Sequence, residues 1–357
     1  MKLNLVMIVK NEERSLRRCL KAAKPLVDQV IIADTGSSDR TAEIARSMGA
    51  VVVNFPWVHD FSAARNFALE QSDGDWNLVL DADEYLRPCS RKNLEKALRS
   101  RSGVWLGGIT RYDSYRDGEI ISQSTSVLPR VLPRGVRYEG IIHEQPEGNH
   151  PCYSLPLAAD HDGYLVEDKG ERNLLYLEEA VRLHPDDGYY QFQMASTLRN
   201  LKRLEESLLY FRNFYRMAEP ASGYRAGGVV LYLYTLLDVG AEECLDEAAR
   251  IVEREERVLG DFPDFCFVCG LFYMKRVLSD VERHMALLPN IEKCYLKCLS
   301  LGERPWMGGV VGTGSFKAAY NLGAWYEVSG QMEMAKQYYR DAAKAGYGPA
   351  KARLRTI

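Results

Sequence analysis

No apolar run in this sequence of 357 residues reaches the roughly 18 to 20 residues that a membrane-spanning helix needs. The first apolar stretch, Leu3–Val9, is far too short, and no cleavage site of small residues follows it, so we expect neither a membrane span nor a secretion signal. A surplus of one charge is also missing, since the net charge of −3 divides into −1 up to residue 165 and −2 beyond it. This balance argues against binding of nucleic acid or another polyanion.

The eight cysteines have no spacing that defines a disulfide framework or a strong metal site. Cys266 and Cys269 form a C-x-x-C pair, but they lie in an apolar stretch without a glycine-rich knuckle. Cys294 and Cys298 would face one side of a helix. Zinc binding by these four is the alternative, and buried free thiols in a cytoplasmic protein are the favoured interpretation.

The composition, 46% hydrophobic and 27% charged, is that of a folded protein, and the length predicts roughly two domains. Up to residue 165, short apolar runs typical of strands alternate with helix-like segments. This alternation favours a mainly parallel α/β sheet that is covered on both faces. The predicted strands are Leu3–Val9, Val27–Asp34, Ala50–Phe55 and Trp76–Asp83, and the predicted helices are Glu12–Ala23, Thr41–Met48 and Ser62–Gln71.

After Asp83 the pattern predicts longer antiparallel strands at 104–114 and 119–132, with a turn near Asp117–Gly118. From Arg172 onward the sequence is helical. Its last segment has small and large residues at the offsets of a 34-residue tetratricopeptide repeat, namely Ala319, Leu322, Gly323, Tyr326, Gly330, Ala335, Tyr339 and Ala342. A looser version with Ala195 lies at 189–220, and Cys269–Gly270 with Tyr273 indicates another degenerate unit.

Acidic residues follow two of the predicted parallel strands, at the end where open α/β sheets bind ligands. Asp34 ends the second strand, and Asp81 and Asp83 end the fourth. On an extended backbone the residues i and i+2 point the same way, so both carboxylates of the D-x-D pair could meet one Mg²⁺ or Mn²⁺ ion. The alternative for each acid is a helix cap or a turn residue.

Four ordered motifs between residues 3 and 165 resemble the family 2 glycosyltransferases of the GT-A fold: VMIVKNEERSLRRCL, VIIADTGSSDRTAEIA, FPWVHDFSAARNFAL and GDWNLVLDADEYL. The segments Gly140–Glu144 and His161–Tyr164, together with the helical repeats, are similar to bacterial peptide S-glycosyltransferases that modify bacteriocin cysteines. The resemblance implies a GT-A domain at 1–168 and an all-α, tetratricopeptide-like domain at 169–357. The Q-x-x-R-W motif of processive members is absent, which argues against polymer synthesis.

The resemblance also implies roles for the residues that match the donor motifs. The stretch from Ile8 and Val9 to Glu12 is expected to cradle base and ribose, with Glu12 on a ribose hydroxyl. Asp34 is expected to accept the imide N–H of uracil, and Arg65 to face the nucleotide. A first-turn helix acid is the alternative for Glu12, and a surface salt bridge is the alternative for Arg65.

For the metal, the resemblance implies Asp83 as the direct ligand of Mg²⁺ or Mn²⁺. Asp81 is expected to touch the ribose or the donor sugar and to contribute to the metal site. His161 is the candidate third ligand. Its alternative is a hydrogen-bonded structural histidine.

Inverting transfer needs a base beside the acceptor, opposite the leaving diphosphate. The segment with His143 and Glu144 is expected to return to the site. Glu144 is the first candidate for the base and Asp113 the reserve. The alternative for either is a salt bridge in a loop.

These expectations describe a non-processive, inverting, metal-dependent enzyme that moves a sugar from a UDP-sugar to a peptide or protein acceptor bound by the helical repeats. A cysteine thiol is one candidate acceptor group. Transfer of a single sugar to a lipopolysaccharide core or another cell-envelope glycan is the rival function. A repeat scaffold without catalysis is a third possibility, against which the intact acids and Arg65 argue. An exposed repeat face could also form a homodimer.

Overall fold

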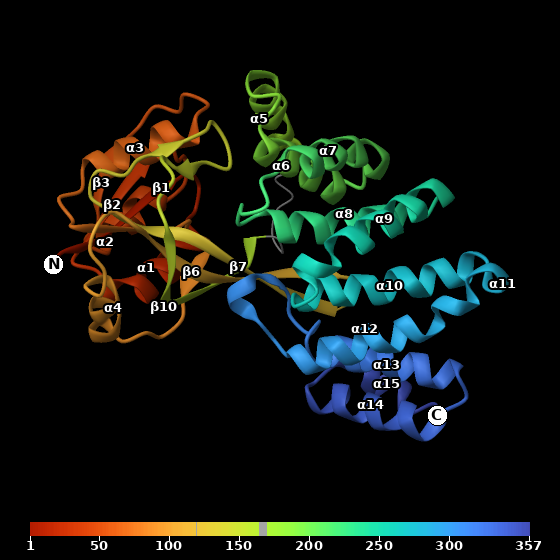
Figure 1. Cartoon of the computed structure of the whole chain (residues 1–357). Coiled ribbons are helices and arrows are strands. Elements are labelled where there is room, and N and C mark those ends of the chain that lie inside the picture. Colours follow the sequence, from red (N-terminus) through yellow and green to blue (C-terminus); the bar gives the residue numbers. More distant parts are fainter. Residues whose placement is uncertain (119, 164–169) are drawn as a thin grey trace. The chain divides into compact units, whose positions relative to one another are not determined.

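The computed structural model describes residues 1–118, 120–163 and 170–357. The chain divides into two compact units, Met1–Lys169 and Gly170–Ile357, which are coloured red to yellow and green to blue (Figure 1). The predicted domain boundary between residues 168 and 169 lies outside the described residues. Within the described part of the chain, no helix has the length and hydropathy to cross a membrane.

The first unit is an α/β unit. Its strands are β1 (Leu3–Val9), β2 (Gln29–Asp34), β3 (Val51–Asn54), β4 (Trp76–Val79), β5 (Glu84–Leu86), β6 (Leu106–Asp117), β7 (Ile120–Pro133), β8 (Tyr138–Glu139), β9 (Gln145–Pro146) and β10 (Cys152–His161). Its helices are α1 (Leu16–Ala23), η1 (Lys24–Leu26), α2 (Thr41–Ser47), α3 (Phe61–Glu70) and α4 (Arg91–Leu98).

The main sheet has the strand order β3-β2-β1-β4-β7-β6-β10-β5. The pairs β3–β2, β2–β1, β1–β4 and β6–β10 are parallel, and the pairs β4–β7, β7–β6 and β10–β5 are antiparallel. In register, Val9 of β1 lies beside Asp34 of β2, and Val6 lies beside Val79 of β4. The carboxyl ends of these three strands therefore meet at one edge.

Alternation along β1 explains why helices cover both faces of the sheet. Leu3, Leu5, Met7 and Val9 join a core with Leu16 and Leu20 of α1, Ile44 of α2, and Leu94 and Leu98 of α4. Val6 points the other way and packs with Ile31, Ala33 and Ala68 of α3. The predicted α/β class with a mainly parallel, doubly covered sheet is confirmed.

Two predicted elements have different bounds in the structure. Helix α1 begins at Leu16, because Glu12 to Ser15 form a turn before it. Strand β4 ends at Val79, and the D-x-D pair lies in a turn that the Glu84 N–H closes on the Asp81 carbonyl (3.1 Å). The prediction that Asp81 and Asp83 lie on an extended backbone and point the same way is therefore wrong. Sequence reasoning also missed β5, α4 and the long strand β10.

The second unit is helical. Its helices are α5 (Gly170–Leu183), α6 (Gly188–Asn200), α7 (Leu204–Met217), α8 (Arg225–Val239), α9 (Glu242–Leu259), α10 (Pro263–Ser279), α11 (Val281–His284), η3 (Met285–Leu287), α12 (Leu288–Leu301), η4 (Pro305–Met307), α13 (Phe316–Val328), α14 (Met332–Lys344) and α15 (Gly348–Arg353), with the short strand β11 (Gly309–Val310) before α13.

Close helix crossings confirm the predicted repeat in α13 and α14. The turn between them uses Gly330 in left-handed backbone (φ 76°). A Cβ on Gly323 would come within 2.9 Å of the ring of Tyr339, so the ring packs where only glycine leaves room. Gly270 of α10 makes the same approach to the ring of Tyr295 of α12, at 2.7 Å. The degenerate middle unit therefore crosses in the same manner as the last repeat.

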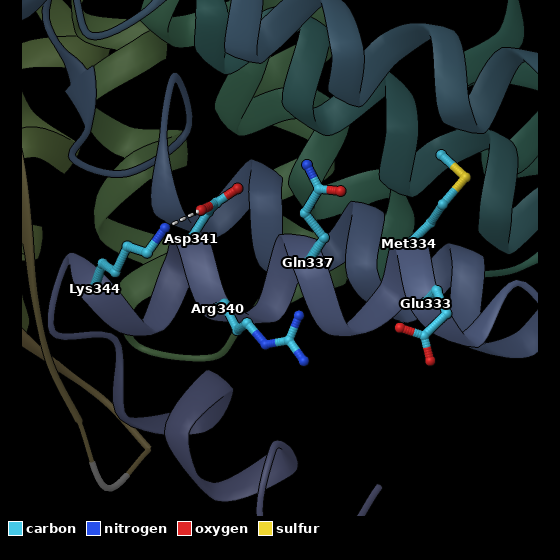
Figure 2. A pocket seen from close by; sticks show the side chains of 6 residues that line it. All are labelled: Glu333, Met334, Gln337, Arg340, Asp341 and Lys344. Atoms are coloured by element: carbon cyan, nitrogen blue, oxygen red, sulfur yellow. Dashed lines mark hydrogen bonds and ion pairs between the residues drawn. The ribbon is translucent and has the colours of Figure 1, made fainter.

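A shallow hollow follows the outer side of α14 (Figure 2). All of its lining side chains come from that one helix: Glu333, Met334, Gln337, Arg340, Asp341 and Lys344. Lys344 and Asp341 form an exposed pair at 2.8 Å, three residues apart. Exposed pairs of this kind contribute little to stability, so this hollow is a solvated helix face.

One buried acid anchors the glycine-rich connection before α13. Asp264, at the start of α10, accepts hydrogen bonds from the N–H of Val310 (2.7 Å) and from the hydroxyl of Thr313. Burial raises the pKa of Asp264 to about 6, although both hydrogen bonds oppose the shift. The folded helical unit therefore binds the Asp264 proton more tightly than the unfolded chain does.

We predict that Asp264→Asn stabilises the protein at neutral pH. Ionisation of Asp264 lowers the free energy of unfolding as the pH rises from about 4 to about 6, and the loss of at most about 3 kcal/mol persists above that range. Thermal melts of the full chain should show the variant gaining over the wild type at pH 7.5 but not at pH 4. Asp261→Asn, a change at an exposed acid beside Lys297, is the control. An equal difference at both pH values would contradict the assignment.

Candidate active site

Acidic side chains gather at the edge where β2, β1 and β4 end. Ile8 and Val9 close β1, and Asp34, the last residue of β2, is buried beside Val9. Oδ1 of Asp34 accepts hydrogen bonds from the N–H groups of Gly36 (3.0 Å) and Ser37 (2.8 Å). Its Oδ2 makes no hydrogen bond within the described residues. One carboxylate oxygen of Asp34 is therefore available to a ligand.

Hydrogen bonds join the loops after β1 and β2. Asn11 donates its N–H to Oγ of Ser37 (3.0 Å), and its Oδ1 accepts from the N–H of Ser38 (2.8 Å). The N–H of Glu12 donates to Oγ1 of Thr41, the first residue of α2, at 2.7 Å. The predicted nucleotide-binding stretch and the Asp34 turn therefore form one connected edge.

Arg65 of α3 is buried between two carboxylates from distant parts of the chain. Its Nη2 donates to Oδ1 of Asp81 (2.7 Å), and its Nε donates to Oε1 of Glu144. The ring of Tyr138 lies 5.7 Å from the guanidinium carbon. Burial lowers the pKa of Arg65, but the charges of Asp81 and Glu144 outweigh it and raise the pKa above its usual range. With 5% of its surface exposed, Arg65 is a central charge of the site and not the surface salt bridge of the alternative interpretation.

The segment with Glu144 reaches Arg65 because the hairpin of β8 and β9 packs on α3. The side chain of Asn66 exchanges two hydrogen bonds of 2.8 Å with the backbone of Tyr138. The N–H of Phe61 donates to the carbonyl of Ile141 (3.0 Å). Glu144 therefore lies one guanidinium group away from Asp81.

Left-handed backbone marks three of the matched motifs. Among the described residues other than glycine, only Asn11 (φ 56°), His59 (φ 62°), His143 (φ 51°) and Lys202 (φ 63°) have positive φ. The first three lie in the K-N-E, F-P-W-V-H-D and I-I-H-E segments. Such conformations concentrate at functional sites, because surrounding contacts must hold them. His143 is half-buried beside Glu144.

Asp81 and Asp83 take different partners because of their turn. Both oxygens of Asp81 are engaged, one by Arg65 and the other by Nη2 of Arg130 (2.7 Å). Burial raises the pKa of Asp81, but the charges of these two arginines hold it well below its usual range. The N–H of Asp81 donates to Oε2 of Glu84 (3.1 Å), which holds the turn. Asp81 and Asp83 are thus not a shared pair of ligands in this conformation.

Asp83 instead meets His161. Its Oδ2 lies 3.5 Å from Nε2 of His161, and Nδ1 of that ring lies 2.7 Å from Oδ1 of Asp113. Asp113 also pairs with Nε of Arg111 (2.8 Å). Burial lowers the pKa of His161, but its hydrogen bonds to Asp113 and Asp83 raise it to about 9. These contacts suit a carboxylate that orients the histidine better than they suit the predicted reserve base.

Gly163 packs closely against this pair. A Cβ on Gly163 would lie 2.4 Å from Oδ2 of Asp83 and 2.7 Å from Nε2 of His161, so only glycine leaves room for both side chains. Within the described residues no group of three His, Cys, Asp and Glu side chains could hold a metal ion. A carboxylate and an imidazole are nevertheless a donor pair that Mn²⁺ accepts, so Asp83 and His161 fit a cation whose remaining ligands come from substrate or water.

The charges around this edge form one connected chain of ion pairs. With His161 protonated, as its pKa of about 9 indicates at neutral pH, their formal charge is −1. Release of that proton, which a cation bound by the ring would require, makes the charge −2, and one divalent cation balances it. The members are Arg65, Asp81, Asp83, Glu84, Arg111, Asp113, Arg130, Glu144 and His161.

Sequence reasoning missed Glu84, Arg111 and Arg130. Glu84 directly follows the D-x-D pair, and this position is the signal that could have identified it. Arg111 and Asp113 are two apart in a strand, so a shared face was readable from the sequence. Arg130 stands alone in the apolar run Val127–Pro133, where an arginine needs a buried partner.

Comparisons with known proteins agree with this geometry. The family described as Glycosyl transferase family 2 matches residues 5–148. A TPR repeat-containing protein of Synechococcus elongatus is 32% identical over 251 residues, which cover 66% of this chain and 61% of that protein. The SPbeta prophage-derived glycosyltransferase SunS of Bacillus subtilis is 27% identical over 217 residues, which cover 57% of this chain and 51% of SunS.

Among solved structures, MamA of Desulfovibrio magneticus overlaps 50% of this chain and 87% of its own, with 16% identity and a TM-score of 0.39. A TM-score this low does not establish a shared fold or function. The chain spans between about half and three fifths of the length of the two curated relatives. The matched motifs, the strand order and the helix pairs lead to one assignment: the first unit of this chain belongs to family 2 of the glycosyltransferases, and tetratricopeptide-like helices follow it.

Proposed function

We propose that this chain transfers a sugar from a UDP-sugar to a peptide or protein, with inversion at the anomeric carbon and with a divalent cation. The observation that carries the proposal is the edge where β2, β1 and β4 end, with Asp34 at one side and the Arg65 group at the other. A nucleotide at this edge would have its base near Asp34 and its diphosphate toward Asp83.

The donor is recognised by groups that the fold leaves available. Oδ2 of Asp34 accepts the imide N–H of uracil, since Oδ1 is already used in the turn. The Asn11 and Glu12 segment lies beside that turn and supplies the contact to ribose. A carboxylate in this place favours a base that offers an N–H at its edge, as uracil does.

Asp83 and His161 would hold Mg²⁺ or Mn²⁺, and Asp113 would orient the histidine ring. A bound cation supplies stabilisation of the negative charge on the departing diphosphate. Asp81, fixed by Arg65 and Arg130, presents its carboxylate to the ribose or the sugar rather than to the cation.

Transfer breaks the bond between the anomeric carbon and the diphosphate oxygen, and UDP leaves with the electron pair. The acceptor heteroatom forms the new bond from the opposite face, and its proton passes to Glu144. Oε1 of Glu144 is occupied by Arg65, whereas its Oε2 makes no hydrogen bond within the described residues. Glu144 therefore suits the role of base better than Asp113, which His161 and Arg111 engage.

The helical unit favours a peptide acceptor over a cell-envelope glycan. Stacked helix pairs of the tetratricopeptide type commonly present extended surfaces to peptides. A cysteine thiol is an acceptor that would need less help from a base than a hydroxyl, because its proton is more acidic.

We expect tight binding of UDP only with a divalent cation present. Titration calorimetry with UDP, with Mn²⁺ or with EDTA, measures this dependence. Asp83→Asn should abolish the gain that Mn²⁺ gives, because it removes the charged ligand. Asp75→Asn, at the opposite end of β4, should behave as the wild type. Equal affinity of the wild type in Mn²⁺ and in EDTA would refute the metal assignment.

Gly163→Ala tests the placement of the cation at Asp83 and His161, against which Gly163 packs. The added methyl group would collide with both side chains and should weaken Mn²⁺ binding by about tenfold or more. Gly227→Ala, in α8, is the control because a Cβ there meets no atom within 4 Å. Calorimetry with Mn²⁺ and a thermal melt separate lost binding from lost stability. Normal Mn²⁺ affinity in Gly163→Ala would mean that Asp83 and His161 do not hold the cation.

Glu144→Gln should lower the rate of transfer by about 10²- to 10⁴-fold, the usual contribution of a general base. Its amide oxygen can still accept from Arg65, so donor affinity should change little. Glu147→Gln, three residues further along, is the control, since its carboxylate accepts the N–H of Arg137 (3.1 Å) and lies outside the ion-pair chain. Single-turnover transfer from UDP-sugar to an acceptor peptide measures the rate. Near-normal turnover in Glu144→Gln would mean that the acceptor is already ionised or that another group takes its proton.

A further inference from the structure

Glu84 is a fully buried carboxylate at the branch point of the ion-pair chain. Its side chain is 0% exposed. It accepts hydrogen bonds from Nη1 of Arg111 (3.1 Å), Nη2 of Arg130 (2.8 Å) and the N–H of Asp81 (3.1 Å). A buried carboxylate is tolerated only when its charge and lone pairs are satisfied in this way. Because the side chain is fully buried, neither oxygen of Glu84 can contact a substrate.

One arm from Glu84 leads to the donor side of the site. Nη2 of Arg130 donates both to Glu84 and to Oδ2 of Asp81 (2.7 Å), so a single group joins the two acids. Glu84 also holds the N–H of Asp81. The place of the Asp81 carboxylate therefore depends on Glu84 through the side chain of Arg130 and through the backbone of the turn.

The other arm leads to the cation side. Arg111 bridges Glu84 and Asp113, at 3.1 and 2.8 Å, and Asp113 holds the ring of His161 at 2.7 Å. The backbone repeats this connection, because Glu84 and His161 are register partners in the β5–β10 pair. His161 then faces Asp83.

We propose that Glu84 is a positioning residue that fixes the distance and orientation between Asp81 on the donor side and the Asp83–His161 pair on the cation side. This inference rests on the proposed function. Glu84 touches neither sugar nor cation. It acts through Arg130 and Arg111, whose guanidinium groups are largely buried and need its charge.

The charge of Glu84 also contributes to cation binding. Glu84→Gln would change the formal charge of the ion-pair chain from −2 to −1 with a neutral His161. Both guanidinium groups donate to Oε1 of Glu84, and the N–H of Asp81 donates to Oε2. With the amide oxygen of the variant in the place of Oε1, its N–H₂ group would face the N–H of Asp81, a donor against a donor, and the turn would lose this hydrogen bond. Both changes weaken the attraction for a divalent ion and loosen the two arms.

A second buried carboxylate, outside the ion-pair chain of the site, lies in the helical unit and supplies a matched control. Glu255 is 3% exposed and accepts both guanidinium bonds of Arg225, at 2.7 and 2.8 Å, together with the hydroxyl of Tyr215. Loss of its charge breaks a buried pair without touching the ion-pair chain of the site.

The experiment titrates Mn²⁺ alone into the full chain and follows the electron paramagnetic resonance signal of the free ion. Glu84→Gln should raise the Kd for Mn²⁺ by about 10- to 100-fold, the range found when an outer-shell partner is lost. Glu255→Gln should lower the melting temperature and leave the Kd for Mn²⁺ within about twofold. Near-ultraviolet circular dichroism of Glu84→Gln checks that its tertiary packing persists.

Arg111→Lys is a second variant that tests the cation side even if Glu84→Gln does not fold. Lysine retains the positive charge beside Glu84 but lacks the planar fork that spans Glu84 and Asp113. It should weaken Mn²⁺ binding in the same direction as Glu84→Gln. Wild-type Mn²⁺ affinity in Arg111→Lys, or in a folded Glu84→Gln, would overturn the positioning role. Failure of the wild type itself to bind Mn²⁺ and UDP would instead refute the proposed function, and this inference with it.

Discussion

The candidate active site depends on one buried positive charge, the guanidinium group of Arg65. It joins three pieces of chain that are far apart in the sequence: helix α3, the turn after β4 with Asp81, and the returning segment with Glu144. Without it the largely buried Glu144 would lose its counter-charge, and breaking a buried pair in this way costs about 3–5 kcal/mol. The position of Glu144, on which its proposed role as base rests, follows from this contact and from the packing of the β8–β9 hairpin on α3.

The sheet determines where that charge can act. Helices α1, α2 and α4 pack on one face of β1, and α3 packs on the other. The carboxyl end of β1 therefore lies between helices, at an edge that the sheet does not cover. The parallel register of β1 with β2 and β4 brings Asp34 and the D-x-D turn to this end. The early end of β4 then separates the two acids of the D-x-D pair, one toward the arginines and one toward His161.

Residues in local patterns were predictable from the sequence, and residues whose meaning depends on a distant partner were not. The alternation of apolar runs predicted the first four strands, and the small residues near Gly323 predicted the last helix pair. Asp34 was readable because it ends a strand. Glu84 and Arg130 were missed, because an acid after a turn and an arginine in a strand gain their significance only when β5, β7 and β4 come together. The same reason explains the error over Asp81 and Asp83, since a turn held by the Glu84 side chain overrides the extended backbone that the apolar run suggested.

The two units solve the problem of buried charge in different ways. In the helical unit, Arg225 balances the buried Glu255, and the buried Asp264 is held by the N–H of Val310 and the hydroxyl of Thr313, so that its raised pKa delays its ionisation. In the α/β unit, the ion-pair chain has one negative charge more than positive ones with His161 protonated, and two more once that proton leaves. Like charges in a partly buried place destabilise the folded state, and a bound cation relieves them. A ligand that binds only the folded chain stabilises it by mass action. The α/β unit is therefore less stable without a cation than with one. The destabilising charges lie at the place where a charged donor would bind.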